Sequence, residues 1–414
     1  MSGVDKTMDI RETFLKLDKQ FTSYGGLEPR GITRLLYSEE WREAVSALQD
    51  IFKENGLEVS SDAVGNVSGR LIGSELPDET IMSGSHIDTV AEGGHLDGQF
   101  GILSALIATL YLKEKYGQPK RTIEVLSIAE EEGSRFPYTF WGVKNFFNLQ
   151  NNDDVKDIAD GEGIKFVDAM RESGFDFKTD DKVRDDIKAF VEVHIEQGQI
   201  LEKEEKQIGV VTGIVGQKRY TINLKGEANH AGTTPMGYRK DAVVAFTEIA
   251  QTLVQKARDI GDPLVVTFGS VKPVPGVVNV VPGEVEFSID TRHIDEAELN
   301  SFAETVEATI NEVSDKYGIT ADINLWMEQS PALMDDSIVK MIEESAEKVA
   351  GGSYKVMPSG AGHDAQIFAG YMPTGMIFVP SIGGISHNVE EETDVEDLVK
   401  GIEVLAETLY KLAY

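Results

Sequence analysis

Apolar positions along the chain recur with two spacings, and these divide most of it into alternating helices and strands. Side chains that repeat every three or four positions predict helices over residues 9–20, 38–55 and 99–115. Short apolar runs rich in β-branched residues predict buried strands at 80–85, 122–129 and 189–194, with a hairpin near 62–69. Strands separated by helices indicate an α/β domain with a mainly parallel sheet.

The order of the elements changes in the middle of the chain. There the pattern predicts strand, helix, two strands, helix and strand, at residues 219–224, 241–258, 264–271, 284–290, 295–317 and 321–326. This β-α-β-β-α-β order is typical of a ferredoxin-like α+β domain. The remainder returns to helix, strand (375–379) and terminal helix. We therefore expect a domain of residues 213–328 inserted into a first domain made of 1–212 and 329–414.

Charge and composition narrow the possible functions. The 414 residues include 39 basic and 71 acidic side chains, a net charge of -32, and no cysteine. So acidic a surface repels phosphate backbones and anionic lipid, and no apolar run approaches the roughly 18 residues of a membrane helix. We expect a cytoplasmic protein that binds neither nucleic acid nor membrane. Without thiols, any metal must be held by His, Asp or Glu.

Residues of the kind that bind metals follow four of the apolar runs. They are His86, Asp88, Asp97, Glu131, Glu132, His194 and His387. In open α/β sheets ligands bind outside the carboxyl ends of the strands, so these side chains are expected at one edge of the sheet. Taken singly, each is explained as well by a helix cap, a turn or a solvated side chain. Their joint position at four strand ends favours a metal site.

A site for two divalent cations has specific chemical needs. It requires neutral imidazoles, a carboxylate shared between the cations, and a further carboxylate that moves protons. The spacing of His86 and Asp88 suits a carboxylate that accepts the second N–H of the imidazole and fixes its tautomer. The adjacent Glu131 and Glu132 can divide the roles of base and ligand between them.

Eight segments together carry a family resemblance. They are GSHIDTVAEGGHLDGQFG, EEEGSRFPYTFWGVKNF, VEVHIEQG, GEANHAGTTPMGYRKDA, NVVPG with DTRH, SGAGHDAQIFA and GGISHN. In this order, from about Arg34 to the C-terminus, they resemble the M20-type metal-dependent amidohydrolases. The resemblance implies two divalent cations, zinc or manganese and in some cases cobalt. It implies that the first is held by His86 and His194, the second by Glu132 and His387, with Asp97 bridging them.

The resemblance also implies catalytic roles. Glu131 would be the general base and acid, Asp88 would orient His86, and Gln197 would contact the substrate. His363 is interpreted as ordering the loop near the second metal. His95 and His293 are interpreted as structural residues.

The inserted domain is, in the family that the chain resembles, a lid and dimerisation domain. The resemblance therefore implies a homodimer, with His230 on the substrate carbonyl oxygen, Asn279 on the substrate and Arg292 on its carboxylate. His230 and Asn279 can belong to the site of either subunit. Without the resemblance, the segment NHAGTTP would be interpreted as a turn followed by the start of a helix, and Arg292 as one partner of a surface ion pair.

Within the family, the motifs look most like the branch that hydrolyses ureido groups. The implied reaction is hydrolysis of a ureido group of allantoate to ureidoglycine, ammonia and carbon dioxide, a step of purine catabolism. An N-carbamoyl-L-amino acid or β-ureidopropionate is the alternative substrate. An alternative of another class is a catalytically silent protein that binds metal or ureides.

Overall fold

The computed structural model describes residues 8–414 and divides the chain into two compact units. Unit 2 comprises Gly213–Leu333 with Gly360–Gly362, and unit 1 comprises the rest of the described chain. Unit 2 continues to Leu333, five residues beyond the expected end of the inserted domain at 328. The added residues include the short strand β14 (Ala332–Leu333), which pairs antiparallel with the end of β6 (Ile208–Ile214). The two segments that connect the units are therefore hydrogen-bonded to each other.

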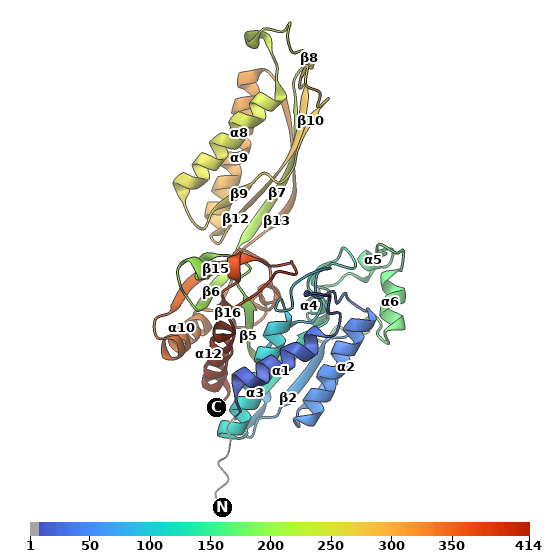
Figure 1. Cartoon of the computed structure of the whole chain (residues 1–414), viewed down its shortest axis with the longest axis vertical. Coiled ribbons are helices and arrows are strands. Elements are labelled where there is room, and N and C mark those ends of the chain that lie inside the picture. Colours follow the sequence, from blue (N-terminus) through green and yellow to red (C-terminus); the bar gives the residue numbers. More distant parts are fainter. Residues whose placement is uncertain (1–7) are drawn as a thin grey trace, which may run out of the picture. The chain divides into compact units, whose positions relative to one another are not determined.

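Unit 1 is built on one mixed sheet (Figure 1). Besides β6, its strands are β1 (Glu58–Ser61), β2 (Val67–Leu71), β3 (Leu76–His86), β4 (Arg121–Ile128), β5 (Ile187–Ile195), β15 (Tyr354–Ser359) and β16 (Thr374–Val379), and β14 of unit 2 pairs with the end of β6. The order is β1-β2-β4-β3-β5-β16-β6-β14, with β15 also paired to β6. The four central strands β4, β3, β5 and β16 are parallel, whereas the flanking strands are antiparallel. The predicted α/β fold with a parallel sheet centre is confirmed.

The parallel centre explains why residues far apart in the sequence meet. The carboxyl ends of β3, β4, β5 and β16 lie at one edge of the sheet, because the four strands run in the same direction. His86 is the last residue of β3, and His194 is the last but one of β5. Glu131 follows the end of β4, and His387 follows the end of β16.

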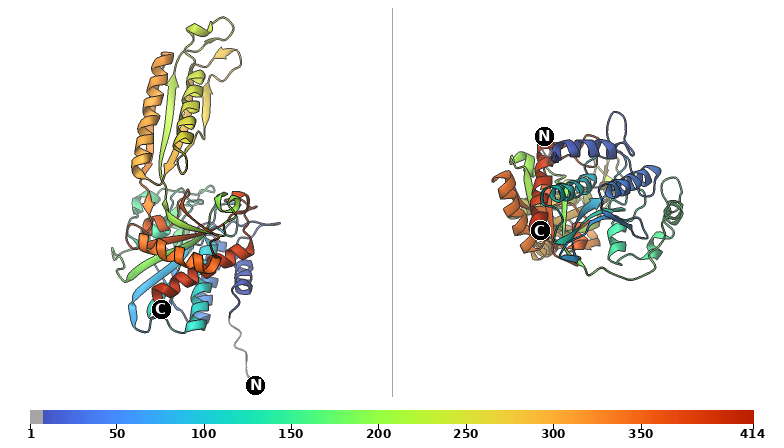
Figure 2. Two further views of the ribbon diagram at one scale, coloured as in Figure 1. Left: turned by 90° about the vertical axis from the view of Figure 1, so that its left-hand side faces the viewer. Right: turned by 90° about the horizontal axis from the view of Figure 1, so that it is seen from below.

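The helices of unit 1 are α1 (Ile10–Thr22), α2 (Glu39–Glu54), α3 (Gln99–Tyr116), α4 (Trp141–Phe146), α5 (Asn152–Val155), α6 (Phe166–Glu172), α7 (Ile200–Lys203), α10 (Asp336–Ala350), α11 (Ala365–Phe368) and α12 (Val395–Ala413). Of these, α2, α3, α10, α11 and α12 pack against strands of the sheet. Helix α3 packs against α1 and α12, and α12 packs against α10 (Figure 2). Gly101 lets α3 approach the sheet, since a Cβ there would lie 2.6 Å from the Cβ of Ser85.

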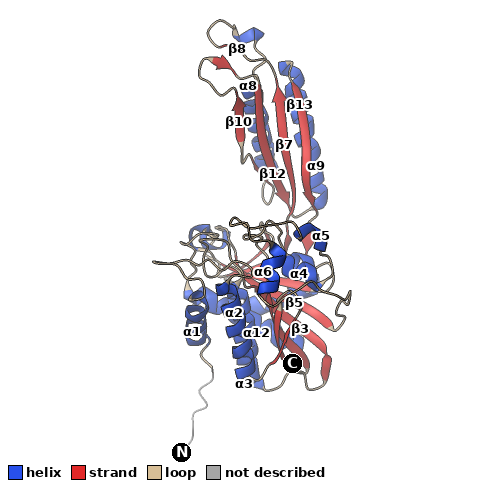
Figure 3. Ribbon diagram, turned by 90° about the vertical axis from the view of Figure 1, so that its right-hand side faces the viewer, coloured by secondary structure: helices blue, strands red, loops and turns tan. Residues whose placement is uncertain are grey.

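Unit 2 is a ferredoxin-like α+β domain (Figure 3). Its strands are β7 (Gly216–Lys225), β9 (Val265–Thr267), β10 (Val271–Val274), β12 (Glu284–His293) and β13 (Thr320–Gln329), and its helices are α8 (Ala242–Ile260) and α9 (Glu296–Tyr317). The antiparallel order is β10-β12-β7-β13. Alternate residues of β7 and β12, such as Ile222 and Phe287, are buried in a core that also contains residues of both helices.

One predicted strand of unit 2 is divided. The strand expected at 264–271 is found as β9 and β10, which pair with opposite ends of β12. Between them Ser288 exchanges hydrogen bonds with Ser270: its Oγ accepts from the Ser270 N–H, and its own N–H donates to the Ser270 carbonyl. The apolar pattern continues through Gly269, so it did not reveal this interruption. Among residues 8–414, no helix is long and apolar enough to cross a membrane.

Candidate metal centre

The carboxylate of Asp97 lies at the centre of the residues gathered at the edge of the sheet. Its Oδ1 is 3.2 Å from His86 Nε2 and 3.1 Å from His194 Nε2. Its Oδ2 is 3.3 Å from His387 Nε2, which is itself 3.2 Å from Glu132 Oε1. Two groups of three ligand-type residues thus share Asp97, one on each carboxylate oxygen. The cluster has the arrangement of a possible metal site.

The loop between β3 and α3 brings Asp97 back to the end of its own strand. This return needs a glycine at position 98, which has a φ of +66° and where a Cβ would lie 2.4 Å from His86 Cε1. On β5, the Nδ1 of His194 lies 2.9 Å from the Ile195 carbonyl oxygen. A neutral His194 that donates from Nδ1 would leave its other ring nitrogen, Nε2, free to bind a cation beside Asp97.

Asp88 connects the ends of β3 and β4. Its Oδ1 lies 3.2 Å from His86 Nδ1 and accepts the Glu131 N–H at 3.0 Å, while its Oδ2 accepts the Glu132 N–H at 3.2 Å. One buried carboxylate therefore holds the imidazole and the backbone of both glutamates. The carboxylates of Glu131 and Glu132 can also form a third group with His86.

Residues around the cluster hold Asp97 in position. Gln197, expected to contact substrate, donates from Nε2 to Asp97 Oδ2 at 2.8 Å, and Ser386 Oγ lies 3.1 Å from the same oxygen. The carboxylate of Glu391 accepts the N–H groups of Leu96 and Asp97 at 3.0 and 3.1 Å. Sequence analysis missed Glu391. It lies within an acidic run, and no pattern distinguishes this buried glutamate from its exposed neighbours.

The electrostatics of the cluster reflect its burial and its close contacts. Burial and the neighbouring Glu132 raise the pKa of Glu131 well above its usual range. Burial opposes ionisation of Asp97, but the contacts with His194, His387 and His86 hold its pKa well below the ordinary value. Hydrogen bonds to Asp97 and Glu132 raise the pKa of His387 to about 10.

The donor set fits divalent cations. All the ligand-type atoms are imidazole nitrogens and carboxylate oxygens, a set that suits zinc, manganese or cobalt. Among the described residues, Gln197 Oε1 is buried without a hydrogen-bond partner. Buried polar atoms are normally satisfied, so this atom indicates room for a further ligand beside Asp97.

The other histidines of unit 1 have different surroundings. The ring of His363 packs edge-on against His194, with 4.4 Å between ring centroids. It therefore contacts a residue of the first group. Burial lowers the pKa of His363 well below its usual value. The following residue, Asp364, is fully buried, and neither of its carboxylate oxygens has a hydrogen-bond partner among the described residues. His95 lies 2.9 Å from Asp18.

The three candidate substrate residues of unit 2 lie at opposite ends of its sheet. His230 is in the short strand β8 (Asn229–His230), which pairs with β11 (Val280–Val281), and the Ala231 N–H donates to the Asn279 carbonyl. Arg292 is opposite Gln217, at the start of β7, whereas β8 follows the end of β7. Nine residues of extended strand separate these ends by about 25 Å.

Arg292 already has partners within unit 2. Its Nε and Nη2 donate to the carboxylate of Asp290 at 2.8 and 3.1 Å, and its Nη1 donates to the Gly360 carbonyl at 2.8 Å. His293 is a structural residue, as expected: its Nδ1 accepts the N–H of Asp295, the cap of α9, at 2.9 Å.

The fold and the cluster together define a class of protein. A His, Asp and Glu cluster at the carboxyl ends of a parallel sheet, with an inserted ferredoxin-like domain, is the architecture of a metal-dependent hydrolase.

Comparison with known proteins agrees with this class. Residues 82–411 match the model of peptidase family M20/M25/M40. The chain is 53% identical to allantoate amidohydrolase of Escherichia coli (strain K12), covering 95% of this chain and 96% of that protein. Identity to allantoate amidohydrolase of Bacillus subtilis (strain 168) is 43%, covering 98% and 99%. An amidase of the hydantoinase/carbamoylase family from Burkholderia multivorans superposes with a TM-score of 0.92, at 30% identity and 98% coverage of both chains. The chain belongs to peptidase family M20/M25/M40, and the predicted resemblance is confirmed.

Cation binding is expected to release protons near pH 7. In the metal-free protein His387 is protonated there, because its pKa of about 10 lies above that pH, whereas a metal ligand must be a neutral imidazole. Titration of zinc into the metal-free protein, by calorimetry in buffers of different ionisation enthalpy, should show net proton release. The release should decrease as the pH is raised through about 10. Binding with no buffer dependence at pH 7 would contradict this description of the cluster.

Proposed function

We propose that the protein hydrolyses a ureido group of allantoate, giving ureidoglycine, ammonia and carbon dioxide. The observation that carries the proposal is the two-sided cluster around Asp97, in a chain so similar to allantoate amidohydrolases over nearly its whole length. Membership of the family is compatible with other amide substrates. The assignment of allantoate as the substrate therefore depends on the 53% identity to the allantoate amidohydrolase of Escherichia coli.

The cluster would hold two divalent cations. We assign His86 and His194 to the first and Glu132 and His387 to the second, with Asp97 between them. The division of contacts between Oδ1 and Oδ2 of Asp97 supports this assignment. Bound divalent cations would lower the pKa of a water molecule and polarise a substrate carbonyl. Asp88 would keep the imidazole of His86 in the tautomer that leaves Nε2 free for a metal.

Glu131 is the proposed general base and acid. Its carboxylate belongs to neither group around Asp97, and its backbone is held by Asp88. A carboxylate with a raised pKa accepts a proton readily near neutral pH and can release it again. Glu131 would take a proton from the attacking water. It would then deliver that proton to the leaving nitrogen as the C–N bond breaks, and the carbamic acid released would break down to ammonia and carbon dioxide.

Arg292 is proposed to bind the carboxylate of the substrate. Three of the five N–H donors of its guanidinium are engaged, with Asp290 and Gly360, so two remain available. The contact with Asp290 would also fix the plane of the guanidinium. Arg292→Lys would lose this planar, two-point geometry.

His230 and Asn279 are proposed to act in a homodimer. Within unit 2 they lie about 25 Å from Arg292, farther than one allantoate molecule can span. If Arg292 serves the site of its own chain, His230 and Asn279 must serve that of a second copy. There His230 would stabilise the carbonyl oxygen and Asn279 would contact the substrate.

Hydrolysis of N-carbamoyl-L-amino acids is the second candidate function. The structural similarity to an amidase of the hydantoinase/carbamoylase family favours it. The bond broken would be of the same kind, and only the side-chain pocket would differ. A silent binding protein is the third candidate, and the presence of Glu131 beside a complete ligand set argues against it.

Ammonia release separates these candidates. With zinc or manganese present, the protein should release ammonia from allantoate with a higher kcat/KM than from N-carbamoyl amino acids. Glu131→Gln should reduce kcat by about 10²–10⁴-fold because the proton carrier is lost. Its metal content should stay unchanged, and the exposed Glu43→Gln serves as the matched control. Preference for a carbamoyl amino acid would overturn the substrate, and an active Glu131→Gln variant would overturn the base.

Mixed dimers test the role of His230. Glu131→Gln and His230→Ala should each be nearly inactive alone. When they are mixed and allowed to exchange subunits, about a quarter of the sites should combine an intact Glu131 with an intact His230 from the other copy. Recovery of about that fraction of activity supports action across the dimer. No recovery, with exchange verified by mass spectrometry of tagged subunits, would place His230 in the site of its own chain.

A further inference from the structure

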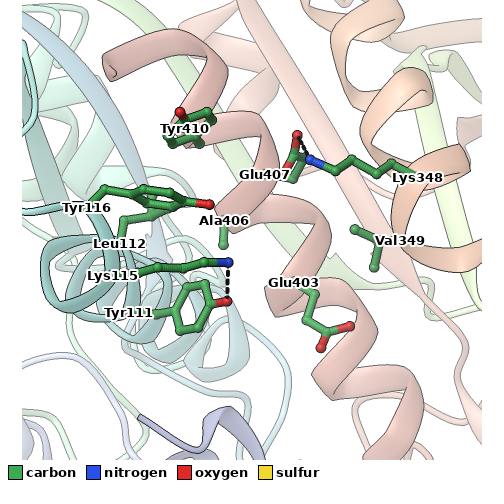
Figure 4. A pocket seen from close by; sticks show the side chains of 10 residues that line it. All are labelled: Tyr111, Leu112, Lys115, Tyr116, Lys348, Val349, Glu403, Ala406, Glu407 and Tyr410. Carbon is green, nitrogen blue, oxygen red and sulfur yellow. Dashed lines mark hydrogen bonds and ion pairs between the residues drawn. The ribbon is translucent and has the colours of Figure 1, made fainter. Parts of the chain in front are cut away.

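A second site-like feature of unit 1 is a cavity of about 270 Å³ between α3, α10 and α12 (Figure 4). Its lining includes Tyr111, Leu112, Lys115 and Tyr116 from α3, and Ala406 and Tyr410 from α12. The residues from α3 are in its last two turns, whereas Asp97 lies just before its start. At 1.5 Å per residue, about 20 Å of helix separates the cavity from the metal cluster. The cavity is therefore a separate site.

The charges around this cavity leave one cation without a carboxylate. Glu407 pairs with Lys348 at 2.7 Å, and Glu403 pairs with Lys400 at 2.7 Å. Lys115 has no ion-pair partner within the described chain, and its Nζ contacts the hydroxyl of Tyr111 at 2.9 Å. Figure 4 shows this ammonium group directed into the space between the helices. Of the two lysines that line the cavity, Lys115 is therefore the one whose ammonium group has no carboxylate within ion-pair distance in the described chain.

Aromatic rings form the side of the cavity next to this charge. Tyr116 and Tyr410 pack with 4.5 Å between ring centroids, yet they remain 45% and 36% exposed. Leu112 and Ala406 add a buried apolar floor. Exposed tyrosine rings beside an apolar floor provide a surface on which another planar ring can stack. Lys115 Nζ lies 5.1 Å from the ring centroids of both Tyr111 and Tyr116, so ring and charge are adjacent.

We propose that this cavity binds a small planar anion, an aromatic or heteroaromatic ring that carries a phosphate or carboxylate group. The ring would stack on Tyr116 and Tyr410, and the anionic group would pair with Lys115. The volume suits a molecule no larger than a mononucleotide, because drug-sized ligands occupy about 300–1,000 Å³. The proposal does not depend on the reaction at the metal centre.

Calorimetric titration of the metal-loaded protein with adenosine 5′-monophosphate tests the proposal. Adenosine provides the ring without the charge, and ribose 5-phosphate the charge without the ring. We expect saturable binding of the monophosphate and weaker binding of both fragments. Lys115→Gln and Tyr410→Ala should each reduce affinity about tenfold. Lys16→Gln, at an exposed position of α1, is the matched control, and thermal melting verifies that each variant is folded.

Three results would overturn the proposal. The first is no saturable binding of the monophosphate at millimolar concentration. The second is binding that neither Lys115→Gln nor Tyr410→Ala weakens, which would place the anion elsewhere, for example on the metals. The third is ribose 5-phosphate binding as tightly as the monophosphate, which would remove the role of the tyrosine rings.

Discussion

The contact on which the site depends is that of one buried carboxylate, Asp97, with three imidazoles. Its Oδ1 faces His86 and His194, and its Oδ2 faces His387. These residues come from two strand ends and two loops, so the geometry holds only if β3, β5 and β16 keep their parallel register. Gln197 and Glu391 then hold the carboxylate and its backbone. The fold thus orients the Asp97 carboxylate so that each of its two oxygens faces a different group of ligand-type residues.

Burial makes this arrangement costly without cations. Asp88, Asp97 and Asp364 are buried at the cluster or beside it, and Asp364 has no hydrogen-bond partner among the described residues. Isolated buried charges are strongly unfavourable unless they are paired or coordinate metals. Two divalent cations would reverse the local sign, which also explains how so acidic a protein would accept an anionic substrate. The net charge of -32 is therefore a poor guide to the charge inside the site.

Periodicity and strand ends predicted much of this from the sequence. The parallel centre, the β-α-β-β-α-β unit and the set from His86 to His387 were all accessible, because buried strands and ligand-type residues leave local signals. Glu391 was not, since burial of one glutamate in an acidic run depends on tertiary packing. The break at Gly269 was not accessible either. An ion pair was one interpretation of Arg292, but its partner, Asp290, depends on side-chain direction and could not be identified from the sequence. The separation of His230 from Arg292 could not be predicted from the sequence, because it follows from the register of β12 with β7.

Anomalous X-ray diffraction from crystals of the zinc-loaded protein tests whether two cations share Asp97. Two anomalous peaks per subunit are expected, one on each side of the Asp97 carboxylate. The first should lie near His86 and His194, and the second near Glu132 and His387. A single peak, or two peaks that do not share Asp97, would contradict this prediction.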